Sequence, residues 1–124
     1  MGTWSGIGVD LVKVERVAKI SPAARARLFT PQELACCVGS PERVAERLAG
    51  RFAAKEAVLK AFGTGLAGGI RWQDIEVVVG AQGNPSVVLH GKALELAEQK
   101  QVRQVLLSIS HDAGLAIAMV ALQT

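Results

Sequence analysis

The sequence predicts an α+β fold in a single domain of residues 1–124. In this fold an N-terminal strand and helices, with a long central helix, pack on an antiparallel sheet. Three observations lead to this expectation. The first half of the chain repeats helix-start patterns, and the second half contains short runs rich in β-branched residues. The length of 124 residues is that of one domain, and neither a linker nor a repeat divides it.

The chain begins with strand-like residues. The run IGVDLV at residues 7–12 favours a strand, although it contains Asp10, which strands disfavour. An amphipathic segment follows at residues 14–20, and Ser21-Pro22 is typical of the start of another short helix.

The next two helix starts are clearer. Thr30 and Glu33 match a capping box, in which each side chain accepts from the other residue's backbone N–H. Ser40-Pro41 repeats the combination of cap and proline, so we expect the long helix at residues 41–62. Gly63-Thr64-Gly65 should end it, since glycine readily takes the left-handed conformation of helix termini.

The second half predicts strands around one further helix. Residues 75–79 and 86–89 should form a hairpin, and residues 92–101 a short amphipathic helix. Two further strands are expected at residues 102–110 and 115–122, joined by His111-Asp112-Ala113-Gly114.

Composition excludes some classes of function. Half of the residues are hydrophobic, which on a short chain favours an oligomer. The net charge of +3 favours anionic partners, but the basic residues are dispersed and do not indicate nucleic acid. The sequence contains no apolar run of the ~18–20 residues that a membrane span needs, and no signal-peptide pattern. We therefore expect a soluble, cytoplasmic protein without a membrane partner.

The stretch RFAAKEAVLKAFGTG, residues 51–65, places three charges in an apolar helix. Glu56 and Lys60 are neighbours on a helical wheel, whereas Lys55 points elsewhere. One interpretation is a solvated ion pair worth ~0.2–0.5 kcal/mol. The other is a half-buried carboxylate that needs a cation or hydrogen-bond donors to stay charged, because this helix lacks a broad polar face.

Asp10 also has two interpretations. It either ends a strand at a sheet edge or meets Glu56 in space. Two carboxylates suit Mg²⁺, whose other positions are filled by water and phosphate oxygens, and Lys60 would then donate to the same phosphates. The glycines of Gly63-Thr64-Gly65 either let a ligand approach backbone N–H groups or simply stop the helix.

Hydrolase and nucleotide-loop motifs are absent. Ser110-His111-Asp112 are consecutive, so they cannot adopt the geometry of a catalytic triad, and the sequence has neither GxSxG nor a Walker A motif. On its own, His111 is interpreted as a surface or capping residue in a hairpin turn.

Two stretches resemble the signatures of a known family. GIGVDLVKVERV and RFAAKEAVLKAFGTG are similar to the two signatures of holo-acyl-carrier-protein synthases, the small bacterial class of 4′-phosphopantetheinyl transferases. The segments FTPQEL, GNPSVVLHGKA and LSISHDAGLAIAMV also fit, so the resemblance covers nearly the whole chain. It implies the 4′-phosphopantetheinyl transferase fold.

The resemblance also implies an activity. This is the transfer of phosphopantetheine from coenzyme A to a serine of an apo acyl carrier protein, with release of adenosine 3′,5′-bisphosphate, in fatty-acid or polyketide biosynthesis. By resemblance, Asp10 and Glu56 bind Mg²⁺, Lys60 and Gly63-Thr64-Gly65 lie against coenzyme A, and His111 lies near the nucleotide. The family works as a homotrimer with sites between subunits.

Acyl carrier proteins are acidic, which suggests a basic docking surface near the N-terminus. The candidates are Arg16, Arg25 and Arg27, with Leu28 and Phe29 as apolar contacts.

Several points stay open at this level. Lys55 is either a second phosphate contact or a side chain that only reaches solvent. The base is either Glu56 or a water that it polarises. The alternatives to a transferase are a non-catalytic module that binds coenzyme A or an acidic partner, and a structural trimer in which Glu56 pairs with Lys60.

Overall fold

The computed structural model describes residues 2–124. The first half contains strand β1 (Trp4–Lys13) and helices α1 (Val14–Ala18), α2 (Pro22–Leu28), α3 (Pro31–Cys36) and α4 (Pro41–Phe62). The second half contains the short 3-10 helix η1 (Trp72–Asp74), strands β2 (Ile75–Val79) and β3 (Pro85–Leu89), helix α5 (Gly91–Gln99), and strands β4 (Gln104–Asp112) and β5 (Leu115–Gln123).

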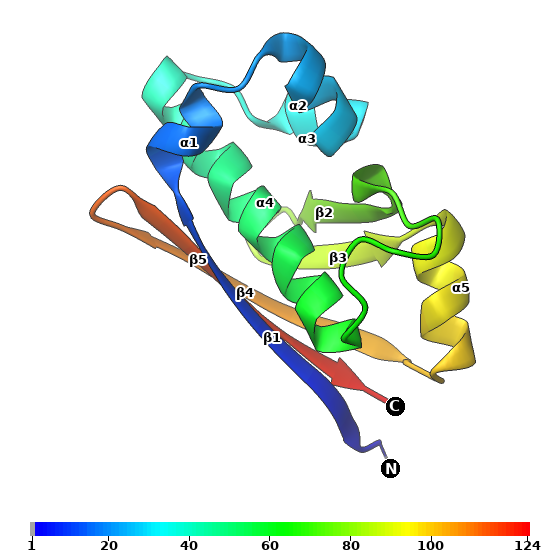
Figure 1. The fold of residues 1–124 in the computed structure, drawn as a ribbon. Helices are drawn as coiled ribbons and strands as arrows, with labels where there is room; N and C mark the ends of the chain where they lie inside the picture. The colour runs from blue at the N-terminus through cyan, green and yellow to red at the C-terminus, as the bar shows by residue number, and fades with distance from the viewer. Residues whose placement is uncertain (1) are drawn as a thin grey trace.

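The strands form two sheets around the long helix α4, which confirms the α+β class. A three-stranded antiparallel sheet has the order β1-β5-β4, and the β2-β3 hairpin forms a separate sheet. In Figure 1 helix α4 crosses one face of the larger sheet, with the hairpin beside it. All strands pair antiparallel, as expected, but they form two sheets where the sequence predicted one, and α5 links the two sheets.

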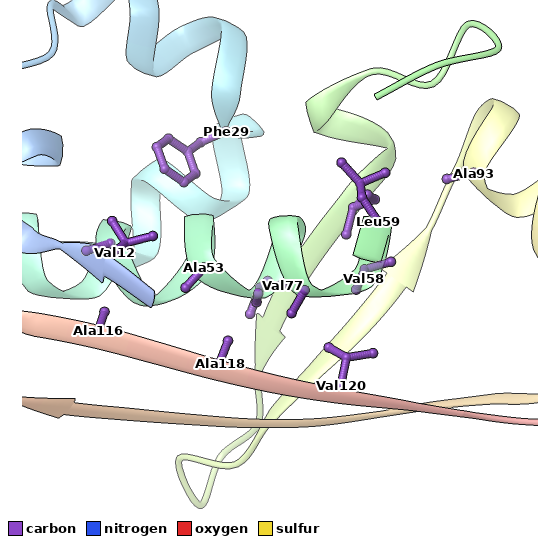
Figure 2. Packing of buried hydrophobic residues seen from close by; sticks show 14 of the residues in the cluster. Val12, Phe29, Ala53, Val58, Leu59, Val77, Ala93, Ala116, Ala118 and Val120 are labelled. Atoms are coloured by element: carbon purple, nitrogen blue, oxygen red, sulfur yellow. The ribbon is translucent and has the colours of Figure 1, made fainter. Parts of the chain in front are cut away.

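Small residues bring α4 close to the larger sheet. Ala53 of α4 is fully buried, as are Ala116, Ala118 and Val120 of β5, which point toward the helix in Figure 2. On β1, a Cβ added at Gly8 would overlap the carbonyl oxygen of Ala57. Strand β1 therefore lies against α4 with backbone nearly touching backbone.

The expected start of α3 and the expected end of α4 are confirmed. The N–H of Thr30 donates to Glu33 Oε1 (2.9 Å), and the N–H of Glu33 donates to Thr30 Oγ1 (3.1 Å). Gly63 ends α4 with a positive φ of 78°. The expected turn before β5 is shorter than predicted, because His111 lies inside β4. The turn consists of Ala113 and Gly114, both with positive φ, which suits the twist of a tight hairpin.

Within residues 2–124, no helix is long and apolar enough to cross a membrane. The expected cytoplasmic location stays a prediction.

Candidate active site

Asp10 lies on β1 with its side chain directed toward α4. Side chains alternate between the faces of a strand, so Asp10 shares its face with the buried Gly8 and Val12, which pack toward the helix. Lys60 Nζ donates to Asp10 Oδ1 (2.9 Å) and to the carbonyl oxygen of Val9 (3.1 Å). Asp10 is therefore a member of an ion pair within an edge strand, and not simply a strand end.

Glu56 lies one turn before Lys60 on α4, but the two do not form the i,i+4 ion pair that was one of the two interpretations of the sequence. Lys60 pairs with Asp10 instead. Burial raises the pKa of Glu56, and the nearby Asp10 carboxylate raises it further, while Lys60 opposes the shift. Two carboxylates thus share one lysine. This part of the structure is short of positive charge, which favours a bound cation.

Glu56 borders two cavities, one on either side. A cavity of about 350 Å³ contains Asp10, Arg16 and Phe52 in its lining. The second has a volume of about 500 Å³ and is lined by Lys60, Gly63, Gly65, Leu59, Leu66 and Trp72. Glu56 is the residue that the two linings have in common.

The glycine loop after α4 contributes backbone to the second cavity. Gly63 and Gly65 border it, both with positive φ (78° and 62°). Thr64 faces elsewhere: its hydroxyl donates to the carbonyl oxygen of Gly65 (3.0 Å), and its side chain borders a separate cavity against α5. The loop thus offers backbone groups, and not the Thr64 side chain, to the space beside Lys60.

His111, a residue of β4, lies beside the first half of α4, far from Lys60 near the end of that helix. Its Nε2 is 2.8 Å from the carbonyl oxygen of Glu46 and must carry the proton, because a carbonyl only accepts. A Cβ at Gly50 would lie 2.9 Å from that nitrogen, so the helix leaves space for the ring there. Ten residues of helix, about 15 Å, separate Gly50 from Lys60. The chain by itself does not bring His111 to the glycine loop.

Lys55 neither contacts the cavities nor reaches solvent, so both expectations for it are wrong. Its side chain is fully buried, and Nζ donates to Glu33 Oε1 (2.8 Å), to the Trp72 carbonyl oxygen (3.1 Å) and to the Ile75 carbonyl oxygen. Burial lowers the pKa of Lys55, and the Glu33 carboxylate opposes that shift. Lys55 belongs to the core beneath the site.

Comparison with known proteins decides the family. The family model described as the 4′-phosphopantetheinyl transferase superfamily matches residues 6–120. The chain belongs to this superfamily.

Relatives in the superfamily include a holo-[acyl-carrier-protein] synthase from Geotalea daltonii. That protein is 44% identical over 95% of this chain and 97% of its own. The crystal structure of the synthase from Plasmodium yoelii matches with a TM-score of 0.86 at 30% identity, over 99% of this chain and 97% of that chain. The structure from Bacillus anthracis in complex with CoA (3′,5′-ADP) matches with a TM-score of 0.80 at 35% identity, over 98% and 97%.

Of the five residues expected to dock the carrier, Arg16, Leu28 and Phe29 line one cavity of this transferase, whereas Arg25 and Arg27 do not. Arg16 is exposed and borders the cavity of Asp10 and Glu56, with the half-buried Leu28. Arg27 is exposed, whereas Arg25 is half-buried and borders a different cavity at the start of α4. Phe29 exposes no surface, so the expectation that it contacts a partner is wrong.

Phe52 and Trp72 were not predicted as site residues of the transferase. Their rings are tilted against each other, with a centroid distance of 5.2 Å and an interplanar angle of 46°. Phe52 borders the first cavity and Trp72 the second. Phe52 lies four residues before Glu56, and this spacing predicts that the two side chains share one face of α4. Trp72 begins the short 3-10 helix η1, and no pattern in the sequence places it beside Phe52.

Proposed function

We propose that this chain transfers the 4′-phosphopantetheine group from coenzyme A to a serine of an apo acyl carrier protein and releases adenosine 3′,5′-bisphosphate. Membership of the superfamily and the named relatives support the reaction class. The observation that carries the assignment of the reacting centre is Glu56, which lies between two cavities and shares Lys60 with Asp10.

We propose that Asp10 and Glu56 hold Mg²⁺. The donor set fits this ion, because Mg²⁺ takes one or two carboxylates and keeps water and phosphate oxygens in its other positions. Among residues 2–124, no cluster of three or more His, Cys, Asp or Glu side chains suits a more heavily ligated metal. The raised pKa of Glu56 means that its charged form is disfavoured in the metal-free chain, and a cation beside it would stabilise that form. When bound, Mg²⁺ would neutralise negative charge on the phosphates of coenzyme A.

The residues of the chain supply positioning and charge. Lys60, whose side chain is about half exposed, donates to the phosphates of coenzyme A, and the backbone of Gly63 and Gly65 permits their close approach. The carrier serine attacks the phosphorus that bears the pantetheine arm. A bond forms between the serine oxygen and phosphorus, and the bond from that phosphorus to the oxygen of adenosine 3′,5′-bisphosphate breaks. The hydroxyl proton goes to a Glu56 oxygen or to a water beside it.

We propose a homotrimer with its sites between subunits. The face of the larger sheet opposite α4 carries exposed apolar side chains: Ile7, Val9, Leu11, Leu106, Ile117 and Met119. Figure 1 shows no element over that face. An exposed apolar face of this kind marks an interface. Within one chain, His111 lies about 15 Å along α4 from Lys60. In the proposed trimer, the His111 beside a given Lys60 would therefore come from a neighbouring subunit.

We propose that the acidic carrier approaches the cavity beside α1. Arg16 is exposed at that cavity, and Arg27 is exposed on the neighbouring helix α2. Such cations attract an acidic partner and set its orientation. In this proposal the carrier serine lies on one side of Glu56 and coenzyme A on the other.

The proposal is tested with the purified protein, coenzyme A, Mg²⁺ and an apo acyl carrier protein. Mass spectrometry should show a gain equal to phosphopantetheine on the carrier, and no gain on a carrier whose acceptor serine is replaced by alanine. Chromatography should show adenosine 3′,5′-bisphosphate in equal amount. Binding of coenzyme A without either product over hours would instead indicate a non-catalytic binding module.

A further inference from the structure

The proposed site rests on a buried ion pair that touches neither cavity. Lys55 and Glu33 have fully buried side chains, 2.8 Å apart. Neither residue belongs to the lining of the cavities that Glu56 borders. Every polar group of the pair is nonetheless used, which is the condition under which a buried ion pair is tolerated.

The contacts of the pair bind three segments together. Lys55 Nζ donates to the carbonyl oxygens of Trp72 and Ile75, at η1 and the start of β2. Glu33 Oε1 accepts from the N–H of Thr30 (2.9 Å), and Oε2 accepts from the N–H of Val77 (2.8 Å). The pair therefore joins the start of α3 and the start of β2 to the turn of α4 that carries Glu56.

The same contacts fix the aromatic side chains around Glu56. Lys55 Nζ lies 5.6 Å from the centroid of the Phe29 ring, which backs the wall of the first cavity. Trp72, whose carbonyl oxygen accepts from Lys55, borders the second cavity, and its ring packs at a tilt against Phe52 of the first cavity. A shift of the pair would move a wall on each side of Glu56.

We propose that Lys55 and Glu33 are positioning residues of the transferase: the buried pair holds the walls that orient the two substrates at Glu56. The inference rests on the proposed reacting centre at Glu56. Misplacement by about 1 Å at a distance from the chemistry can reduce a rate about 100-fold. Loss of the pair should thus reduce kcat in a protein that is still folded.

The test uses Lys55→Met and Glu33→Gln, measured well below their melting temperatures. Both variants should lose about 30-fold or more in kcat, with the Kd of adenosine 3′,5′-bisphosphate within about threefold of wild type, since Lys60 and the glycine loop lie outside the pair. The control is Leu122→Ala, a change at a buried residue near the end of β5, which should lower the melting temperature and keep kcat. Equal loss of kcat in the control, or wild-type kcat in both pair variants, would overturn the proposal.

A second readout does not depend on catalysis. In a Trp4→Phe background, Trp72 is the single tryptophan and reports its own wall by fluorescence. Adding Lys55→Met should shift the emission maximum of Trp72 to longer wavelength and increase its quenching by acrylamide, whereas Leu122→Ala should change neither. Unchanged Trp72 fluorescence in the Lys55→Met protein would contradict the proposal.

The Glu56→Gln variant separates the proposed reacting centre from the proposed positioning role. If it is inactive while both pair variants are fully active, the reacting centre stands and the positioning role is wrong. If Glu56→Gln keeps wild-type activity, both are wrong.

Discussion

At the scale of single residues, Glu56 holds a charge that the fold disfavours. Burial and the Asp10 carboxylate both raise its pKa, and Lys60, which opposes this shift, forms its ion pair with Asp10. A residue kept at a cost in stability is typical of a functional site. The cost has a direct consequence for stability as a function of pH.

Glu56→Gln should stabilise the metal-free protein near neutral pH. Because the folded state raises the pKa of Glu56, it binds more protons than the unfolded state from about pH 4.3 up to the raised value, and stability falls as pH rises through that window. Glutamine does not titrate and avoids this loss. In EDTA, the gain in melting temperature should appear as pH rises through the window and persist at neutral pH.

Calorimetry of both proteins across that pH range makes the comparison. Glu46→Gln, at an exposed position of the same helix, controls for the simple loss of a carboxylate. A Glu56→Gln protein that is less stable than wild type at neutral pH without metal would show that Glu56 is already compensated in the fold.

At this scale, the sequence predicts correctly which residues are neighbours when they lie on the same face of one helix. The helical wheel placed Glu56 and Lys60 side by side, and both border one cavity. It showed that Lys55 points elsewhere but not what lies there. The partner of Lys55 is Glu33. The sequence shows the capping box of Glu33 but not its contact with Lys55, because that contact joins residues 22 apart in the chain.

At the scale of elements, the approach of β1 to α4 sets the distance between Asp10 and the helix. Gly6 and Gly8 face α4, and a Cβ at either would overlap a carbonyl oxygen of the helix, Ala61 and Ala57 respectively. The strand therefore depends on glycine at both positions to bring Asp10 within 2.9 Å of Lys60.

Gly8→Ala should destabilise the fold and weaken the site. The added methyl group has no space, and overpacking of this kind costs about 1–3 kcal/mol of unfolding free energy. Urea denaturation should show the loss, and binding of coenzyme A with Mg²⁺ should weaken because Asp10 moves away from α4. Ser5→Ala, an exposed change on the same strand, is the control and should have little effect. Wild-type stability in Gly8→Ala would mean that β1 and α4 are less closely packed than described.

The helix ends could be predicted because caps are local. Thr30 with Glu33 and the terminal Gly63 act within a few residues, and the structure has both. The division of the strands into two sheets depends on which strands meet, and no short-range pattern encodes that. The same holds for His111, whose place in β4 follows from pairing with Ala116 of β5.

At the scale of the whole molecule, the larger sheet is covered on one face only. The uncovered face carries exposed apolar side chains on all three strands, including Val9, Leu106 and Met119. The apolar composition favoured an oligomer, but only the alternation along the strands shows which face is apolar and exposed. The proposed trimer would bury this face.

Met119→Lys should break that trimer. Met119 lies on the central strand β5 and is 51% exposed, so in the proposed trimer a buried lysine would lack a partner. Light scattering should give three times the chain mass of 13.0 kDa for wild type and a smaller species for the variant, with transfer activity lost alongside. Leu94→Lys on α5, also exposed, should leave both unchanged. A wild-type protein that is monomeric and active would contradict an interfacial site.

The most direct test of the central claim is the rate of phosphopantetheine transfer in Glu56→Gln beside wild type and Glu46→Gln. Each protein is assayed with saturating coenzyme A, Mg²⁺ and apo carrier, and the mass of the carrier is followed over time. We expect Glu46→Gln to match wild type and Glu56→Gln to lose about 100-fold or more, the usual effect of removing a group that stabilises the transition state. Transfer at the wild-type rate by Glu56→Gln would show that the reacting centre lies elsewhere.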